Sequence, residues 1–359
     1  MPRKKKAKYD PAIVPLDHFK NSRISNSPAI RLENVVRDSV NFRNEMLAAN
    51  KVKYFRSFDL IRVPYPTKYA YLNAISIPSP MTHIFNRLFV VQVDSADGLK
   101  TVLVSPSDIH ANEETPFFKR LSDSFGRYKT LGKKLVAPEI NTVPGCLEQI
   151  GLSVSDIDYI TYDHLHTQDI RNWLGSYDRE GLFPNAKLLV MKEEWESTLS
   201  LLPPQRDWYC PGGIDGVDPA KIVLLEEDVM VGEGLALIKT PGHTVGNHSI
   251  VVHSEEGLFV TSENGVGPDN YAPFHSDIPG LRAYAQNTGA EVVMNGNTLE
   301  GSVEQYISMV QEKTIAGPSM RNPDFPNMLC SSEMTAYWAF PGLKPTFSFG
   351  EVAYGVLSA

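Results

Sequence analysis

Two short segments of this chain carry histidines at a spacing suited to metal binding. The first, residues 162–169, reads Tyr-Asp-His-Leu-His-Thr-Gln-Asp and places His164 and His166 two positions apart. Where a strand gives way to a loop, a period of two directs both imidazoles to the same side. Two neutral imidazoles that converge on one point form half of a site for a divalent transition metal.

The second segment supplies a candidate third ligand. Residues 240–249 read Thr-Pro-Gly-His-Thr-Val-Gly-Asn-His-Ser and hold His243, and a later apolar run ends at Glu263, a further candidate. Three imidazoles leave a fourth position open for water, as in a catalytic zinc site, and the metal lowers the pKa of that water from about 15.7 toward about 7. The residues therefore predict a site that can generate a metal-bound hydroxide at neutral pH.

The composition limits the class of protein. The chain has 359 residues, of which 42% are hydrophobic and 21% are charged, and this is typical of a soluble globular protein with a sizeable core. The formal net charge of −8 argues against a nucleic-acid surface. No apolar run reaches the roughly 18–20 residues that a membrane span requires. We therefore expect a small-molecule substrate, with no nucleic acid and no membrane as partner.

The N-terminus and the cysteines favour a reducing compartment. The basic run at residues 2–8 is followed by no apolar segment, so it does not indicate a secretory signal. We interpret this run as a solvated arm, with an anionic surface or a nuclear address as alternatives. Cys146, Cys210 and Cys330 form no C-x-x-C motif and no disulfide framework, and we interpret them as small buried side chains. A cytoplasmic location is expected.

The hydrophobic pattern predicts the elements that position the histidines. We expect strands before each histidine segment and before Glu263, with a hairpin turn at residues 97–98. The expected strands are residues 58–63, 69–77, 85–93, 101–104, 159–162, 187–191, 235–239, 249–253 and 258–261. The expected helices are residues 32–49, 117–125, 144–150, 193–201, 278–287 and 303–314.

Three regions follow from this pattern. Residues 1–54 are expected to form an N-terminal arm and helix, and residues 55–316 the main domain, with the candidate ligands in loops at strand ends. Residues 317–359, rich in Pro, Met and aromatic residues, are expected to form a C-terminal extension. This extension would pack on the main domain or on a partner in a homodimer.

Taken in order, these segments resemble the metallo-β-lactamase superfamily of metal-dependent hydrolases. The resemblance runs from about residue 85 to residue 298 and includes the helix and strand at 147–161, the Phe-Pro-Asn-Ala block at 183–186 and the Thr-Pro-Gly-His-Thr-x-Gly block ending at Gly246. It implies an α/β fold, the αββα sandwich of two mixed β-sheets with helices on the outer faces.

The first motif departs from the pattern of the family. That motif is H-x-H-x-D-H, and this chain keeps the first two histidines as His164 and His166. Gln168 stands at the position of the family's aspartate, and Asp169 stands at the position of its last histidine. Two ligands of the second metal site in the family are therefore changed.

The later ligands follow the same division. The resemblance assigns the next histidine ligand to His243, the bridging aspartate to Glu263 and the terminal histidine to Asn297. The first metal site is retained and the second is rewritten, which favours one ion per chain. Zinc is the expected metal at the three histidines, with manganese or iron as alternatives. The rewritten oxygen-only second set suits harder ions such as manganese or magnesium and would bind them weakly.

Several polar residues have open roles. Asp169 is a candidate metal ligand, a candidate general acid or base, or a hydrogen-bond partner that orients a ligand imidazole. Glu263 is expected to bind the metal or to hold the attacking water, and so is a candidate catalytic residue. Asp163 either orients His164 or caps the strand end. The remaining candidates for substrate or ligand-supporting contacts are Gln168, Asn297 and His275.

These features predict a metal-dependent hydrolase acting on a small organic substrate, most simply an ester or lactone, and no organic cofactor. Metal-assisted dehalogenation, elimination, decarboxylation or iron–oxygen chemistry on the same fold is the alternative. A non-catalytic metal-binding protein is a further alternative, against which the retention of three histidines argues.

Overall fold

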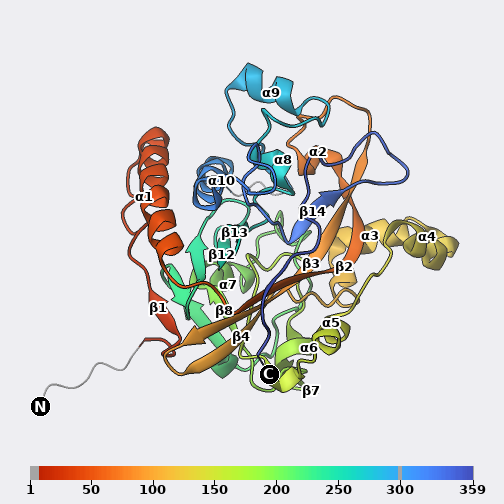
Figure 1. Ribbon diagram of the computed structural model, residues 1–359. Helices are drawn as coiled ribbons and strands as arrows, with labels where there is room; N and C mark the ends of the chain where they lie inside the picture. Colours follow the sequence, from red (N-terminus) through yellow and green to blue (C-terminus); the bar gives the residue numbers. More distant parts are fainter. Residues whose placement is uncertain (1–7, 298–300, 359) are drawn as a thin grey trace, which may run out of the picture.

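The computed structural model describes residues 8–297 and 301–358, and Figure 1 shows two β-sheets enclosed by helices. Residues 2–7 of the basic run, and residue 298 at the end of the family resemblance, lie outside the described residues. No helix among the described residues has the length and apolar character that a membrane crossing requires.

The first sheet is antiparallel throughout. Its strand order is β1-β10-β11-β12-β13. The bounds are Ile13–Pro15 for β1, Val229–Val231 for β10, Leu235–Lys239 for β11, His248–Ser254 for β12 and Gly257–Thr261 for β13. The N-terminal segment thus contributes the edge strand of this sheet.

The second sheet is mixed, with order β15-β2-β3-β4-β5-β8-β9 and with β14 paired to β3. Strands β4, β5, β8 and β9 run parallel to one another, so the ends of β5 and β8 meet at one edge. The bounds are Tyr54–Pro66 for β2, Met81–Ser95 for β3, Gly98–Val104 for β4, Tyr159–Thr161 for β5, Lys187–Met191 for β8, Ile222–Leu225 for β9, Ser332–Thr335 for β14 and Ala353–Gly355 for β15. A separate hairpin joins β6, Gly175–Ser176, to β7, Arg179–Glu180.

Alternation along the strands separates three apolar layers. In β11, Leu235 and Leu237 belong to the core between the two sheets, whereas Ala236 and Ile238 face the layer that packs under α1 and α10. In β3, Val91 lies in the core between the sheets, whereas neighbouring side chains join the layer under α5. The order helix, sheet, sheet, helix confirms the expected fold class, although the first sheet is antiparallel and not mixed as expected.

The six predicted helices are present, with shifts of up to four residues at their ends, but the sequence pattern does not predict the helix at Lys129–Val136 or the single helical turns. Figure 1 shows α1 and α10 side by side over the first sheet. The longer helices are α1 (Pro28–Ala48), α3 (Pro116–Asp123), α4 (Lys129–Val136), α5 (Val143–Ile150), α7 (Lys192–Thr198), α9 (Leu281–Thr288) and α10 (Ser302–Ala316). Single helical turns are α2 (Thr67–Ala70), α6 (Arg171–Leu174) and α8 (Pro268–Tyr271).

One expected strand is wrong. Residues 69–77 do not form a strand, because α2 ends at Ala70 and a turn follows. Leu72 has φ of 45° and Asn73 has φ of 60°, which excludes an extended conformation at both positions. The apolar residues that suggested a strand instead pack into the core from a loop, with Tyr71 only 1% exposed.

The C-terminal extension packs on the body of the same chain. Its two strands join the second sheet, β14 beside β3 and β15 beside β2. Arg87 of β3 is fully buried and donates to Glu333 of β14 and to Asp59 of β2. The division of the chain at residues 54 and 317 stays a prediction.

Candidate metal centre

The first histidine segment follows the end of β5, in the middle of the second sheet. His164 and His166 stand in the loop after this strand, where their side chains point to the same side. Thr167, the next residue, has φ of 63°, a left-handed conformation that is strained for a β-branched side chain. Its backbone N–H donates to the carbonyl of Trp208 at 2.7 Å, which stabilises this turn.

His243 stands in the loop between β11 and β12. Gly242, just before it, has φ of 148°, and a Cβ there would lie 2.2 Å from the Cα atom of Gln305 in α10. No larger residue fits at this position without moving the helix. The backbone N–H of His243 donates to Oδ1 of Asn264 at 3.1 Å, which ties this loop to the end of β13.

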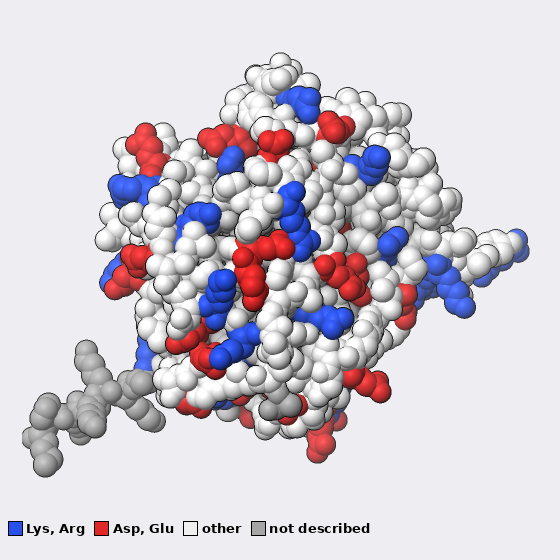
Figure 2. Space-filling view, in the orientation of Figure 1, with Lys and Arg blue, Asp and Glu red and all other residues white. Residues whose placement is uncertain are grey.

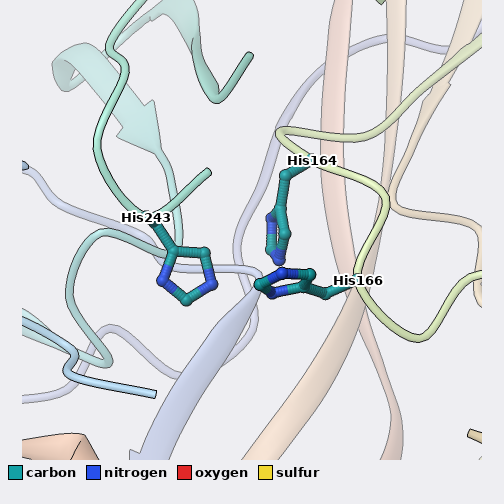
Figure 3. Close-up of side chains that lie close together, drawn as sticks. All are labelled: His164, His166 and His243. Carbon is teal, nitrogen blue, oxygen red and sulfur yellow. The ribbon is translucent and has the colours of Figure 1, made fainter. Parts of the chain in front are cut away.

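The three imidazoles converge on one point (Figure 3). Their candidate ligand nitrogens all lie within 4.8 Å of one another, and these histidines form the only such group in the part of the chain that the structure describes. Ring centroids of His164 lie 4.5 Å from those of both His166 and His243. All three side chains are buried. The predicted triad is thus assembled from two loops that are far apart in the sequence.

The chemistry of this group fits a divalent metal. Neither ring nitrogen of His166, nor Nε2 of His164, has a hydrogen-bond partner among the described residues. Buried polar atoms without a partner are costly, and a metal ion held by these imidazoles would supply the missing interaction. Three imidazole nitrogens suit zinc, iron, copper or nickel better than magnesium or calcium.

The three histidines of the cluster differ in their pKa values. Burial, followed by the neighbouring charge of His164, holds the pKa of His166 well below its ordinary value. Burial and then the charge of His164 also hold the pKa of His243 well below its ordinary value. Burial also lowers the pKa of His164, but the carboxylates of Asp163, Glu263 and Glu194 outweigh this effect and raise it to about 9. Two of the imidazoles are therefore neutral, the form that binds a metal.

Asp163 contacts both His164 and the backbone of Glu263. Its Oδ1 is 3.3 Å from Nδ1 of His164, and its Oδ2 accepts the backbone N–H of Glu263 at 2.6 Å. Its backbone carbonyl accepts the N–H of His248 at 2.9 Å, which joins the loop to β12. Of the two roles expected for Asp163, orientation of His164 fits these contacts.

Glu263 lies beside the histidines, although it is not part of the group of three. Its Oε2 is 3.9 Å from Nε2 of His164, and its Oε1 accepts hydrogen bonds from Ser331 at 3.0 Å and from Ser332 at 2.6 Å. Burial and the carboxylate of Asp163 raise the pKa of Glu263. Its placement is compatible with either expected role, at the metal or at the water.

Asp169 is held by Arg171. Its two carboxylate oxygens accept from the backbone N–H and the guanidinium of Arg171, and its own N–H donates to Oδ1 of Asn112. Gln168 is held from the same side, since its Oε1 accepts from Ser107 and from Asn112 at 3.2 Å each. Asp169 is not part of the described metal-binding group, and its assignment as a ligand stays a prediction.

Of the other candidates, Gln168 and Asn297 line the cavity beside the triad, and His275 does not. Asn297 and Gln168 line the same cavity as His166 and Glu263. His275 is not brought to this cavity, because it lies at the surface with Nδ1 3.7 Å from a carboxylate oxygen of Asp324.

A cavity of about 150 Å³ opens onto His166 and Glu263. Its walls are largely apolar and come from β2, from the segment containing α3 and α4, and from Trp208. Apolar members include Ile61, Val63, Ile84, Phe118, Leu121, Phe125 and Val136. Polar groups are concentrated near the histidines, where Gln168, Asn295, Asn297 and Ser332 join the lining. Such a cavity accommodates a substrate with one polar and one apolar end.

Sequence reasoning did not identify several of these residues. Ser331 and Ser332 bind Glu263 from the C-terminal extension, which the motifs do not reach. Glu194 on α7 accepts hydrogen bonds from both histidine loops. Arg171 donates to the carboxylate of Asp169. A glutamate in a first helical turn and serines near a strand are too common to stand out in one sequence.

No known family model matches this chain. Over 143 residues the chain is 25% identical to an N-acyl homoserine lactonase of Bacillus thuringiensis, covering 39% of this chain and 50% of the lactonase. An N-acyl homoserine lactonase of Bacillus cereus is 25% identical over 140 residues, covering 37% and 50%. The chain thus spans about half the length of the curated relatives that it matches.

Solved structures give a weaker likeness. A crystal structure of a quorum-quenching N-acyl homoserine lactone lactonase is 16% identical, covers 70% of this chain and 93% of that chain, and has a TM-score of 0.44. AidC, described as a dizinc quorum-quenching lactonase, is 12% identical, with coverage of 87% and 97% and a TM-score of 0.45. The hydrolase AbOPH is 14% identical, with coverage of 86% and 100% and a TM-score of 0.39.

Proposed function

We propose that this protein is a metal-dependent hydrolase of an ester or lactone that carries an apolar group. The observation that carries the proposal is the buried cluster of His164, His166 and His243 beside a largely apolar cavity. The partial sequence match to N-acyl homoserine lactonases supports the same reaction class. One divalent ion per chain is proposed, with zinc first and iron or manganese as alternatives.

A divalent metal held by three imidazoles lowers the pKa of a coordinated water and polarises a carbonyl oxygen. His164, His166 and His243 would hold it. The departures at Gln168 and Asp169 support a single ion, because Asp169 is paired with Arg171 and Gln168 carries no charge.

Glu263 is the proposed general base and acid of the reaction. Its carboxylate lines the cavity next to the histidines, with Oε2 3.9 Å from Nε2 of His164, where it can exchange a proton with a bound substrate or water. The hydroxyl groups of Ser331 and Ser332 fix the Oε1 atom of Glu263. The other oxygen, Oε2, is the one directed to the triad.

The cavity walls bind the apolar part of the substrate. Phe118, Leu121 and Phe125 come from one segment around α3, and Val63 and Ile84 come from β2 and β3. Contact with these side chains removes apolar surface of the substrate from water and excludes water from the reacting end. The few polar groups near the triad then set the orientation of the ester or lactone.

We also propose a reducing, cytoplasmic location and a homodimer. All three cysteines are free and buried, which supports the first proposal. Exposed apolar side chains on and beside α4 support the second, since Leu131, Leu135 and Trp338 are each more than half exposed and Trp338 donates to the carbonyl of Leu135. The molar mass in solution tests the dimer directly.

Hydrolysis assays test the proposed reaction. Protein loaded with one equivalent of zinc would be supplied with esters and γ-lactones bearing acyl chains of increasing length, and acid release would be followed with a pH indicator. We expect turnover that rises with chain length and that disappears when a chelator removes the metal. Absence of turnover on the whole panel with zinc, iron and manganese would overturn the proposal.

A further inference from the structure

We propose that Glu194 is a positioning residue that locks the two histidine loops together and thereby sets the affinity of the metal centre. The inference rests on the proposed function, because it concerns the same triad. Glu194 lies in the first turn of α7, directly after β8, and its side chain is fully buried. It therefore sits beneath the site and not in the substrate cavity.

The two carboxylate oxygens of Glu194 reach different loops. Oε1 accepts the backbone N–H of Leu165, the residue between His164 and His166, at 2.8 Å. Oε2 accepts the hydroxyl of Thr244, the residue after His243, at 2.6 Å. One side chain thus binds next to all three imidazoles and connects segments that are about eighty positions apart in the sequence.

Glu194 also contacts Tyr209, whose ring packs against His166. Oε1 of Glu194 also accepts the hydroxyl of Tyr209 at 3.2 Å. The ring of Tyr209 packs edge-on against the ring of His166, with centroids 4.7 Å apart. Glu194 therefore fixes both the backbone beside His166 and an aromatic ring that limits its rotation.

The surrounding backbone is built to allow this approach. Gly246 lies so close to α7 that a Cβ there would be 2.1 Å from the backbone nitrogen of Glu194. The last glycine of the Thr-Pro-Gly-His-Thr-x-Gly block is thus required by a close contact between this loop and α7. A buried carboxylate is unfavourable unless donors surround it, and here donors from three segments contact it.

The experiment measures zinc affinity in the full chain. Metal-free wild-type protein, Glu194→Ala, Glu194→Gln and Thr244→Val would be titrated with zinc in competition with a chromophoric chelator, and the melting temperature of each metal-free protein would be recorded. Glu193→Gln is the matched control, because Glu193 is the neighbouring carboxylate on the same helix and pairs with Lys239 outside the site.

We expect Glu194→Ala to weaken zinc binding by about 10- to 100-fold, in the range found for residues that support metal ligands. Glu194→Gln should restore part of the affinity, because its amide oxygen can still accept from Leu165. Thr244→Val removes the hydroxyl that donates to Oε2 of Glu194, and its zinc affinity should fall between those of wild type and Glu194→Ala. Glu193→Gln should bind zinc as the wild type does.

The outcomes separate the two proposals. Wild-type protein that binds no zinc, and no iron or manganese when titrated in the same way, would overturn the proposed function and this inference with it. Zinc affinity that is equal in wild type and in folded Glu194 variants would overturn only the inference, as would a lower melting temperature with unchanged affinity. If the Glu194 variants do not fold, Thr244→Val decides, and an affinity equal to that of the wild type would overturn the inference.

Discussion

Asp163 joins the two halves of the candidate site, because its Oδ2 accepts the backbone N–H of Glu263 at 2.6 Å, from a position 100 residues further along the chain. Its other oxygen lies 3.3 Å from Nδ1 of His164. One buried carboxylate therefore supports a ligand imidazole and also fixes the end of β13. The geometry of the triad and the position of Glu263 depend on the same side chain.

Replacing Asp163 with Asn should weaken the metal centre. The neutral amide no longer stabilises the imidazole of His164, and it loses one charge-assisted acceptor for the N–H of Glu263. We expect zinc affinity to fall by about 10- to 100-fold, measured by competition with a chelator. Asp97→Asn, in the exposed hairpin between β3 and β4, is the control. Unchanged affinity in Asp163→Asn would contradict the role of this residue.

Asp169→Asn should leave the metal in place. The carboxylate of Asp169 is directed to Arg171, whose side chain is 27% exposed and can be solvated when the pair is lost. We expect the metal content per chain to stay at the wild-type value, measured by elemental analysis of purified protein. A loss of metal as complete as that in His166→Ala would show that Asp169 is a ligand.

Leu121→Glu should impair substrate binding and spare the metal. Leu121 lines the apolar cavity, and a carboxylate there would have to be desolvated against an apolar substrate. We expect KM for a long-chain ester to rise at least tenfold with metal content unchanged. Leu199→Glu is the matched control, because Leu199 is 63% exposed and does not line the cavity. Equal KM values in the two variants would argue against this cavity as the binding site.

The stability of the metal-free protein should depend on His83. Burial lowers the pKa of His83 from 6.5 to about 4, and its ring stacks on Tyr337 with centroids 3.8 Å apart. Because the folded-state pKa is the lower one, the stabilisation is complete above pH 6.5 and is lost as the pH falls toward 4. A difference of this size corresponds to a loss of about 3 kcal/mol over that window.

Urea unfolding of wild type and His83→Gln between pH 7 and pH 4, both without metal, measures this effect. The free energy of unfolding should fall less steeply with decreasing pH in the variant than in the wild type. His275→Gln, at an exposed imidazole, should keep the wild-type slope. Parallel curves for wild type and His83→Gln would contradict the expectation.

The triad could be predicted from local patterns, and the two-sheet architecture could be predicted because those segments, taken in order, resemble a known superfamily. His164 and His166 share a period of two after a short buried strand, and His243 lies in a block with its own turn residues. Strand β11 has the expected bounds because its alternation matches two apolar layers. In each case a short segment carries the whole signal.

The rest could not be predicted because it depends on contacts between distant segments. The apolar residues at 69–77 resemble a strand, but the left-handed backbone at Leu72 and Asn73 turns them into a buried loop. Likewise, the binding of Ser332 to Glu263 and of Glu194 to both histidine loops follows from the packing of α7 and β14. No periodicity in one sequence reports such contacts.

The metal content of the purified protein tests the central claim most directly. Wild type and His166→Ala would be prepared without added metal and then equilibrated with zinc, iron or manganese, and bound ions would be counted by elemental analysis. We expect one ion per chain in the wild type and none in His166→Ala. Wild-type protein that binds no metal ion, or His166→Ala protein that retains the wild-type metal content, would contradict a metal centre formed by His164, His166 and His243.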